Sequence, residues 1–290
     1  MELLEDLVFH KKYNISELMD EYDAFFFDIW GVLHEGGDLY PGIINMMNKL
    51  SSHNKTVRLI SNVPRLKTNT SQYLKDRGMN IDENMIFTSG ELTRTILTES
   101  EKHLSRKIQN IFHIGQDRNE EILSNLDISS VDHPSKADAI LITSYRDFNE
   151  KQEDLIKTIE IATAYNKLAI CANPDTQVLH QGNIRYCAGY FANIFEKLGG
   201  EVLYIGKPDK LIFEHCIKTL SSEDHRILMV GDTFATDIKG ANNAGIDSAL
   251  VLTGNSRVLI NKTGIQDEIL AINKICSTQS CLPKYLIELS

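Results

Sequence analysis

The 290-residue sequence lacks several features that would assign it to a specialised class of protein. Its five cysteines are odd in number, irregularly spaced and without a CxxC pair, which indicates neither a disulfide framework nor a zinc site. No stretch approaches the roughly 18 consecutive apolar residues of a membrane-spanning helix. The acidic start, residues 1–6, lacks the basic and apolar regions of a signal peptide. We therefore expect a cytoplasmic protein with reduced cysteines and no membrane partner.

The sequence also lacks an excess of basic residues. Lysine and arginine number 30 against 40 aspartates and glutamates, so the formal net charge is −10 at pH 7. Nucleic acids and anionic membranes bind to basic surfaces, and we expect neither as a partner. Small phosphorylated molecules need only a few local cations or a metal ion, and they remain compatible with this charge.

Short apolar runs alternate with amphipathic helical patterns over most of the sequence. Such alternation predicts parallel sheets covered by helices, and near-continuous apolar strands are typical of sheets buried on both faces. We find no internal repeat and no low-complexity linker. The expected strands span residues 24–29, 57–61, 111–114, 139–143, 168–171, 202–205, 227–230 and 248–252. The expected helices span residues 43–50, 155–165, 188–198, 211–220 and 236–244.

The candidate catalytic and ligand-binding residues fall into an early and a late group along the sequence. The segment between them, from about residue 91 to 200, carries its own strand–helix units. We therefore predict an α/β protein in which residues 1–90 and 201–290 form a core domain and residues 91–200 form an inserted α/β domain.

Asp28 is the first residue with a suggestive position. It follows Phe25, Phe26 and Phe27, which predict a buried strand, and it precedes a turn at Gly31 that lets a ligand approach the backbone. Open α/β folds carry out their chemistry at the carboxyl edge of the sheet, where this carboxylate is expected. It can act there as a nucleophile that forms an acyl phosphate, although an acid at a strand end can also simply cap a helix.

A second acidic strand end occurs late in the chain. The apolar run 227–230 precedes Gly231 and Asp232, and Asp237 follows one helical turn later. Two acidic strand ends suit a hard cation, and Mg²⁺ prefers a few carboxylates together with water and phosphate oxygens. The alternative is that Asp232 caps the helix through Ile238, which does not exclude metal binding.

Two further strand ends carry polar groups. Ser61 and Asn62 end or follow the expected strand 57–61, and a hydroxyl with free backbone N–H groups suits phosphoryl oxygens. Lys207 lies between a glycine and a proline after another strand, so its backbone is restrained. Its ammonium can neutralise carboxylate and phosphate charge.

The order and spacing of these motifs closely resemble those of the haloacid dehalogenase (HAD) superfamily of hydrolases. The long insertion between the second and third motifs looks like that of the class IIA subgroup, which includes 4-nitrophenylphosphatase-like, nucleotide, phosphoglycolate and pyridoxal phosphatases. The resemblance implies a Rossmann-like parallel-sheet HAD core with an inserted α/β class IIA (C2) cap domain. The residues that carry it are Asp28, Ser61, Lys207 and the Asp232/Asp237 pair.

The resemblance, which spans about residues 24–256, also implies catalytic roles. Asp28 would be the nucleophile, Ser61 and Asn62 would bind the phosphoryl group, and Lys207 would be a charge anchor. The substrate would be a small phosphorylated molecule.

The resemblance further implies a Mg²⁺ cofactor. The ion would be held by Asp28, the backbone carbonyl of Trp30 and Asp232, with Asp237 close by or bridged through water.

The loop from Ala172 to Gly182 resembles the substrate-specificity loop of the subgroup. Asn173, Asp175 and His180 are therefore expected substrate contacts, although a histidine in a loop is often simply solvated. Related caps often dimerise, so the resemblance leaves a homodimer open.

Position 30 departs from the phosphatase pattern. Phosphatases of the superfamily carry a second aspartate two residues after the nucleophile, and it protonates the leaving group and then deprotonates the attacking water. The indole of Trp30 does neither. Loss of a general acid/base costs ~10²–10⁴-fold in rate, or about 3–5 kcal/mol. We predict a slow Mg²⁺-dependent phosphatase, with His34 and Glu35 considered as replacement acid or base.

Three alternatives stay open. The protein could bind or transfer a phosphoryl group without efficient hydrolysis, so that aspartyl-phosphate accumulates at Asp28. It could be a dehalogenase, because that branch has a tyrosine at position 30; that branch, however, lacks Mg²⁺ and the acidic pair formed here by Asp232 and Asp237. It could also be a scaffold that senses a metabolite or binds a protein.

Overall fold

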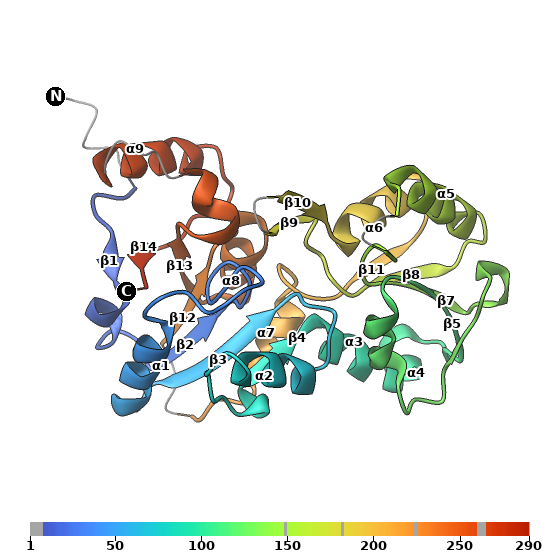
Figure 1. Cartoon of the computed structure of the whole chain (residues 1–290), viewed down its shortest axis with the longest axis horizontal. Helices are drawn as coiled ribbons and strands as arrows, with labels where there is room; N and C mark the ends of the chain where they lie inside the picture. The colour runs from blue at the N-terminus through green and yellow to red at the C-terminus, as the bar shows by residue number, and fades with distance from the viewer. Residues whose placement is uncertain (1–7, 148–149, 181–182, 223–225, 260–264, 290) are drawn as a thin grey trace. The chain divides into compact units, whose positions relative to one another are not determined.

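The computed structural model describes residues 8–147, 150–180, 183–222, 226–259 and 265–289 (Figure 1). Its contacts group the chain into two compact units. The first unit comprises Met1–Ile60, Leu74–Ile81 and Phe213–Ser290, and the second comprises Ser61–Tyr73 and Asp82–Ile212. The domain boundaries expected at residues 90/91 and 200/201 stay a prediction.

The larger sheet has seven strands in the order β1-β14-β13-β12-β2-β3-β4. Phe25, Phe26 and Phe27 of β2 have no exposed surface, as expected for a central strand that is covered on both faces. Phe27 lies opposite Val230 of β12 on one side and Leu59 of β3 on the other, and both pairings are parallel. The carboxyl ends of these three strands therefore lie at the same edge. The strands are β1 (Tyr13–Asn14), β2 (Ala24–Phe27), β3 (Thr56–Ser61), β4 (Ile86–Thr88), β12 (Ile227–Gly231), β13 (Asp247–Val251) and β14 (Tyr285–Glu288).

The second unit contains a five-stranded sheet in the order β11-β8-β7-β5-β6, with parallel pairing throughout. A separate antiparallel hairpin, β9-β10, follows β8 in the chain. Phe191 and Phe195 of helix α6 (Ala188–Lys197) pack with Leu155 and Ile159 of helix α5 (Gln152–Thr163) in the core of this unit. The strands are β5 (Asn110–Ile114), β6 (Ser129–Ser130), β7 (Ala139–Ile142), β8 (Leu168–Cys171), β9 (Gln177–His180), β10 (Asn183–Tyr186) and β11 (Val202–Tyr204).

Helices α1 (Ile43–Ser52) and α5 (Gln152–Thr163) begin without a side-chain capping bond, whereas some other helical segments begin at a residue whose side chain caps them. The Thr88 hydroxyl, for example, accepts a hydrogen bond from the Glu91 N–H at 3.0 Å and so caps α3. The α-helices are α1 (Ile43–Ser52), α2 (Lys67–Lys75), α3 (Ser89–Thr98), α4 (Ser100–Leu104), α5 (Gln152–Thr163), α6 (Ala188–Lys197), α7 (Lys210–Ile217), α8 (Lys239–Ala244) and α9 (Ile265–Cys276). The shorter helical segments are η2 (Ile15–Leu18), η3 (Glu83–Met85), η4 (Asp117–Leu123), η5 (Pro134–Lys136), η6 (Phe234–Ile238) and η7 (Gly254–Leu259).

The predicted α/β fold with parallel sheets is confirmed. All eight expected strands are present, and α9 packs in a buried cluster with Leu250 of β13 and Leu286 of β14. None of the helices in the described ranges has the length and apolar character needed to cross a membrane. The cytoplasmic location and the homodimer stay predictions.

Candidate active site

Three buried carboxylates meet at the carboxyl edge of the larger sheet. Asp28 follows β2 and Asp232 follows the adjacent strand β12, while Asp237 lies in η6. One oxygen of each carboxylate lies within 4.8 Å of the others, and the residues are only 7%, 1% and 0% exposed. Carboxylates this close repel one another strongly unless a cation compensates their charge. An all-oxygen donor set of this kind fits a hard cation such as Mg²⁺.

Asp237 also holds the backbone beside Asp232. Its Oδ2 accepts hydrogen bonds from the N–H groups of Asp232 and Thr233, each at 3.1 Å. These bonds fix the backbone just before η6, a turn of π-helix whose N-cap residue, Thr233, makes no side-chain capping bond. The structure thus differs from the alternative in which Asp232 is the cap.

A strap formed by residues 253–256, after β13, encloses Asp232. The Asn255 N–H donates to Asp232 Oδ2 at 2.6 Å, and the Thr253 hydroxyl donates to the Gly31 carbonyl at 2.5 Å. The 253–256 strap therefore fixes the orientation of the Asp232 carboxylate and ties it to the turn that follows β2.

Two glycines permit this close packing. Gly31 and Gly254 have φ angles of +86° and +53°, where residues with a side chain are strained. A Cβ on Gly31 would lie 2.4 Å from Asp232 Oδ2, and one on Gly254 would lie 2.2 Å from the same atom. The Gly31 turn is predictable from the sequence, and residues 252–254 resemble a hallmark of the class IIA subgroup, but the contact of the 253–256 strap with Asp232 appears only in the structure. A glycine within a polar run directly after an apolar strand was the available signal.

Trp30 lies two residues after Asp28 and is partly exposed. Its ring meets the His34 ring edge-on, with centroids 5.4 Å apart and planes at 72°. His34 Nδ1 accepts a hydrogen bond from the Gly36 N–H at 2.9 Å. Burial, and then the charge of Arg77, lowers the pKa of His34 to about 4. His34 is therefore a neutral imidazole at pH 7 and a poor proton donor to a leaving group.

Glu35 is bound to the same strap region. Its Oε1 accepts from the Gly254 N–H at 3.0 Å, and its Oε2 lies 3.1 Å from Arg257 Nη1. Both oxygens are thus occupied. Neither His34 nor Glu35 is arranged as a proton donor to replace the second aspartate.

The second unit brings Ser61, Asn62 and Lys207 together. The Asn62 amide bonds the backbone of Lys207 twice: Oδ1 accepts from the Lys207 N–H at 2.7 Å, and Nδ2 donates to the Lys207 carbonyl at 3.0 Å. All three residues are at most 4% exposed. A buried ammonium needs anionic or polar partners, which makes Lys207 a suitable group for a phosphoryl oxygen.

Asn173 and Asp175 belong to the same network. The Asp175 Oδ1 accepts from Asn62 Nδ2 at 3.0 Å, and Asn173 Oδ1 accepts from the Asp175 N–H at 3.1 Å. The turn at 173–175 is therefore tied to the segment that follows β3. His180 ends β9, but its side chain lies outside the described residues. The roles of these residues as substrate contacts stay predictions.

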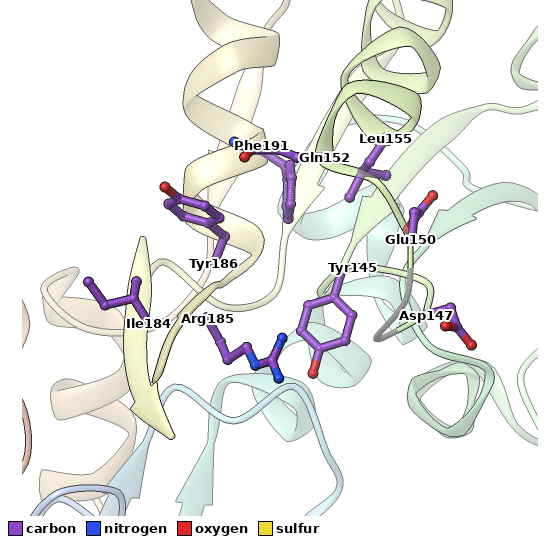
Figure 2. A pocket seen from close by; sticks show the side chains of 9 residues that line it. All are labelled: Tyr145, Asp147, Glu150, Gln152, Leu155, Ile184, Arg185, Tyr186 and Phe191. Atoms are coloured by element: carbon purple, nitrogen blue, oxygen red, sulfur yellow. The ribbon is translucent and has the colours of Figure 1, made fainter. Parts of the chain in front are cut away.

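A cavity of about 230 Å³ lies within the second unit (Figure 2). Tyr145, Tyr186 and Phe191 give it aromatic walls, and Arg185 adds a cation whose guanidinium lies beside the Tyr145 ring. Ligand cavities commonly combine aromatic walls with a few polar groups, so this one suits part of a small molecule.

Two family models match the chain. One, described as haloacid dehalogenase-like hydrolase, covers residues 25–129, and one described as HAD-hydrolase-like covers residues 204–270. Together they include Asp28, Ser61, Lys207 and the Asp232/Asp237 pair.

Curated and solved proteins give the same result. The chain is 26% identical to the dihydroxyacetone phosphatase of Corynebacterium glutamicum, over 79% of this chain and 80% of that protein. It is 24% identical to the ribonucleotide monophosphatase NagD of Escherichia coli, over 79% and 87% of the two chains. A haloacid dehalogenase-like hydrolase from Brucella suis is 31% identical, with a TM-score of 0.75 and coverage of 86% and 91%. A possible sugar phosphatase of the HAD superfamily from Cytophaga hutchinsonii is 28% identical, with a TM-score of 0.78 and coverage of 97% and 98%.

Proposed function

Because the chain belongs to the haloacid dehalogenase superfamily of hydrolases, we propose that it is a Mg²⁺-dependent phosphatase of a small phosphorylated metabolite. The observation that carries this proposal is the buried trio Asp28, Asp232 and Asp237 at the carboxyl edge of the sheet. The similarity to a dihydroxyacetone phosphatase and a ribonucleotide monophosphatase supports a sugar phosphate or a nucleotide as the substrate.

In the proposed reaction, a carboxylate oxygen of Asp28 attacks phosphorus. The bond between phosphorus and the leaving-group oxygen breaks, and the leaving group departs with the electron pair. Water then attacks the aspartyl-phosphate, which releases inorganic phosphate and regenerates the Asp28 carboxylate.

The other groups would hold the substrate in place. We assign Ser61, Asn62 and Lys207 to the phosphoryl oxygens, with the Ser61 hydroxyl and the Asn62 backbone N–H as donors and Lys207 as a buried cation. The Asn62 side-chain amide already donates to Asp175 and to the Lys207 carbonyl. Asn173, Asp175 and His180 are proposed as contacts to the rest of the substrate.

The trio and the Trp30 carbonyl would hold Mg²⁺. The ion would neutralise negative charge that builds up on the phosphoryl oxygens. Asp232 is pre-oriented for this role by its hydrogen bond from Asn255.

We expect turnover to be slow because no carboxylic acid stands at position 30. His34 is neutral at pH 7, and both oxygens of Glu35 are already bound. A leaving group that needs a proton would therefore depart slowly.

A panel of phosphoesters assayed with and without Mg²⁺ tests the proposal, with Asp28→Asn as the matched variant. We expect hydrolysis that needs Mg²⁺ and disappears in Asp28→Asn. Hydrolysis that survives the substitution or a chelator, or the lack of hydrolysis on every ester, would contradict it.

The indole at position 30 favours a second candidate function, in which the protein accepts or binds a phosphoryl group but hydrolyses it poorly. In that case intact-mass measurement would show a phosphorylated chain that is absent in Asp28→Asn. A non-enzymatic scaffold would instead be stabilised by Mg²⁺ and a phosphate mimic without turnover. A dehalogenase ranks lowest, because the acidic pair Asp232 and Asp237 is retained.

A further inference from the structure

The segment that follows β3 enters helix α2 without a capping side chain of its own. The first N–H groups of a helix have no partner within the helix. Here the Leu66 N–H donates to Glu121 Oε1 at 3.1 Å, and the Lys67 N–H donates to Glu91 Oε2 at 3.2 Å. Two carboxylates from distant parts of the sequence therefore stabilise this helix start, where the helix dipole favours negative charge.

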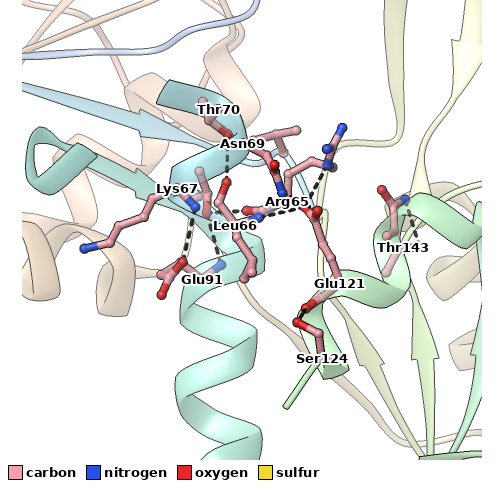
Figure 3. Close-up of polar contacts among 12 residues, drawn as sticks. Arg65, Leu66, Lys67, Asn69, Thr70, Glu91, Glu121, Ser124 and Thr143 are labelled. Atoms are coloured by element: carbon pink, nitrogen blue, oxygen red, sulfur yellow. Dashed lines mark hydrogen bonds and ion pairs between the residues drawn. The ribbon is translucent and has the colours of Figure 1, made fainter. Parts of the chain in front are cut away.

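Glu121, in η4, makes two further hydrogen bonds to this region besides the one from the Leu66 N–H. Its Oε1 also accepts from Arg65 Nε at 2.7 Å, and its Oε2 accepts from Asn69 Nδ2 (Figure 3). The Glu121 and Arg65 side chains are only 20% and 28% exposed. Charge-assisted hydrogen bonds in a partly buried site are stronger than neutral ones, so Glu121 restrains this segment at three points.

The N-cap residue and the first turn of helix α3 form hydrogen bonds to the backbone of the same segment. The Thr88 hydroxyl donates to the Arg65 carbonyl at 2.6 Å, and the Gly90 N–H donates to the Val63 carbonyl at 3.2 Å. A Cβ on Gly90 would lie 2.4 Å from the backbone nitrogen of Arg65, so the two segments are in direct backbone contact. Residues 63–66 are thus fixed by α3 and by Glu121 together.

We propose that Glu121 is a positioning residue for the phosphoryl-binding groups, an inference that rests on the proposed function. Residues 63–66 directly follow Ser61 and Asn62, and Asn62 in turn bonds the backbone of Lys207 on both sides. A shift of the segment would therefore displace the hydroxyl, the amide and the ammonium together. Glu121 acts through these groups and does not itself contact the substrate.

Glu121→Gln is the primary test, because it keeps the shape of the side chain but replaces one acceptor oxygen with a donor and removes the charge. The matched control is Glu153→Gln, an exposed glutamate in α5 of the same unit. Asn69→Ala is a milder second variant that removes only one of the three contacts. Stability and secondary structure of each variant are measured first by thermal unfolding.

The decisive readout is the affinity for inorganic phosphate, measured both by calorimetry and as competitive inhibition of 4-nitrophenyl phosphate hydrolysis. We expect Glu121→Gln to weaken phosphate binding and to lower kcat/KM by about tenfold to a hundredfold, because small displacements of binding groups have large effects on rate. Asn69→Ala should weaken both to a smaller degree, and Glu153→Gln should resemble the wild type. Mg²⁺ affinity, followed by Trp30 fluorescence, should stay unchanged in all three.

A folded Glu121→Gln variant with wild-type phosphate affinity and wild-type kcat/KM would overturn the inference while leaving the proposed function intact. A loss of stability without a loss of phosphate affinity would also overturn it, since that result describes a purely structural contact. If the wild type neither binds nor releases phosphate, the proposed function itself fails and this inference fails with it.

Discussion

The indole ring of Trp30 stands edge-on to the imidazole of His34, with ring centroids 5.4 Å apart. An aromatic ring therefore stands two residues after Asp28, at the position where the resemblance to HAD phosphatases implies a general acid. His34 is neutral at pH 7, so the pair offers no ready proton.

Trp30→Asp should raise turnover of alkyl phosphates, because it restores a group that can protonate the leaving oxygen. The gain expected for a positioned general acid/base is ~10²–10⁴-fold. Trp30→Asn is the matched control, since it has the same size but transfers no proton. If Trp30→Asp and Trp30→Asn both fold, bind Mg²⁺ and hydrolyse alkyl phosphates at the same rate, position 30 does not limit the reaction.

The wild type should prefer aryl and acyl phosphates to alkyl phosphates. Their leaving groups have low pKa values and depart without a proton, so the absence of an acid at Trp30 matters less. The measurement is kcat/KM for a series of esters with graded leaving-group pKa. The dependence on leaving-group pKa should become shallower in Trp30→Asp, and a dependence that is flat in the wild type would refute the prediction.

Mg²⁺ should change the intrinsic fluorescence of the protein, because Trp30 is the single tryptophan of the sequence and its carbonyl is a proposed metal ligand. Addition of a chelator should reverse the change. Asp232→Asn should weaken the apparent affinity by at least about tenfold, whereas Asp267→Asn, an exposed change in α9, should not. If the Mg²⁺ titration curve of Asp232→Asn were the same as that of the wild type, the metal would bind at another site.

Gly254→Ala should reduce Mg²⁺ affinity as well as stability, since the new methyl group would lie 2.2 Å from Asp232 Oδ2. Gly245→Ala is a control for the backbone effect alone. Gly245 also has a positive φ, +72°, but a Cβ there would meet nothing within 4 Å. Both variants should lose about 1 kcal/mol from backbone strain. If Mg²⁺ affinity fell equally in both, the contact with Asp232 would not be the cause.

Stability should fall in acid as Asp23 is protonated. Hydrogen bonds from the Arg226 side chain and backbone lower the pKa of Asp23 to about 2, and the Asp23–Arg226 pair joins the starts of β2 and β12. Because the folded pKa lies below the unfolded value, the contribution is present above about pH 4 and is lost as the pH falls towards 2. It should amount to about 1 kcal/mol or less, since the pair is partly exposed.

Urea unfolding of wild type and Asp23→Asn between pH 2.5 and 7 measures this contribution. The stability difference should be present at neutral pH and shrink below about pH 4. A difference that stays constant across the range would mean that the Asp23 charge plays no part.

Strands with continuous apolar runs were predictable from the sequence, whereas several other elements were not. Phe25, Phe26 and Phe27 identify β2 because a strand buried on both faces has no polar position. Helix α2, in contrast, has the polar sequence KTNTSQYLK, which shows no clear apolar stripe. Its start is stabilised by Glu91 and Glu121, and contacts over such sequence distances leave no local pattern.

Some features of the candidate site were likewise predictable from the sequence, and others were not. The acidic trio was predictable, because each acid follows a strand or lies one turn beyond it, and parallel strands bring their carboxyl ends together. The bonds from Thr253 and Asn255 to the trio region were not, because they depend on how a loop folds over a neighbouring strand. The occupied oxygens of Glu35 were hidden for the same reason, since Arg257 is remote from it in sequence.

The parallel pairing of β2 with β12 has a consequence for how this protein is made. During synthesis β2 (Ala24–Phe27) leaves the ribosome long before its partner β12 (Ile227–Gly231), because the two strands are far apart in the sequence. Until then one edge of β2, with its three consecutive phenylalanines, has no strand beside it, and an unpaired apolar edge is a site of self-association. A chain that stops before residue 227 would keep that edge open permanently. We therefore expect the nascent chain, more than the finished enzyme, to depend on chaperones.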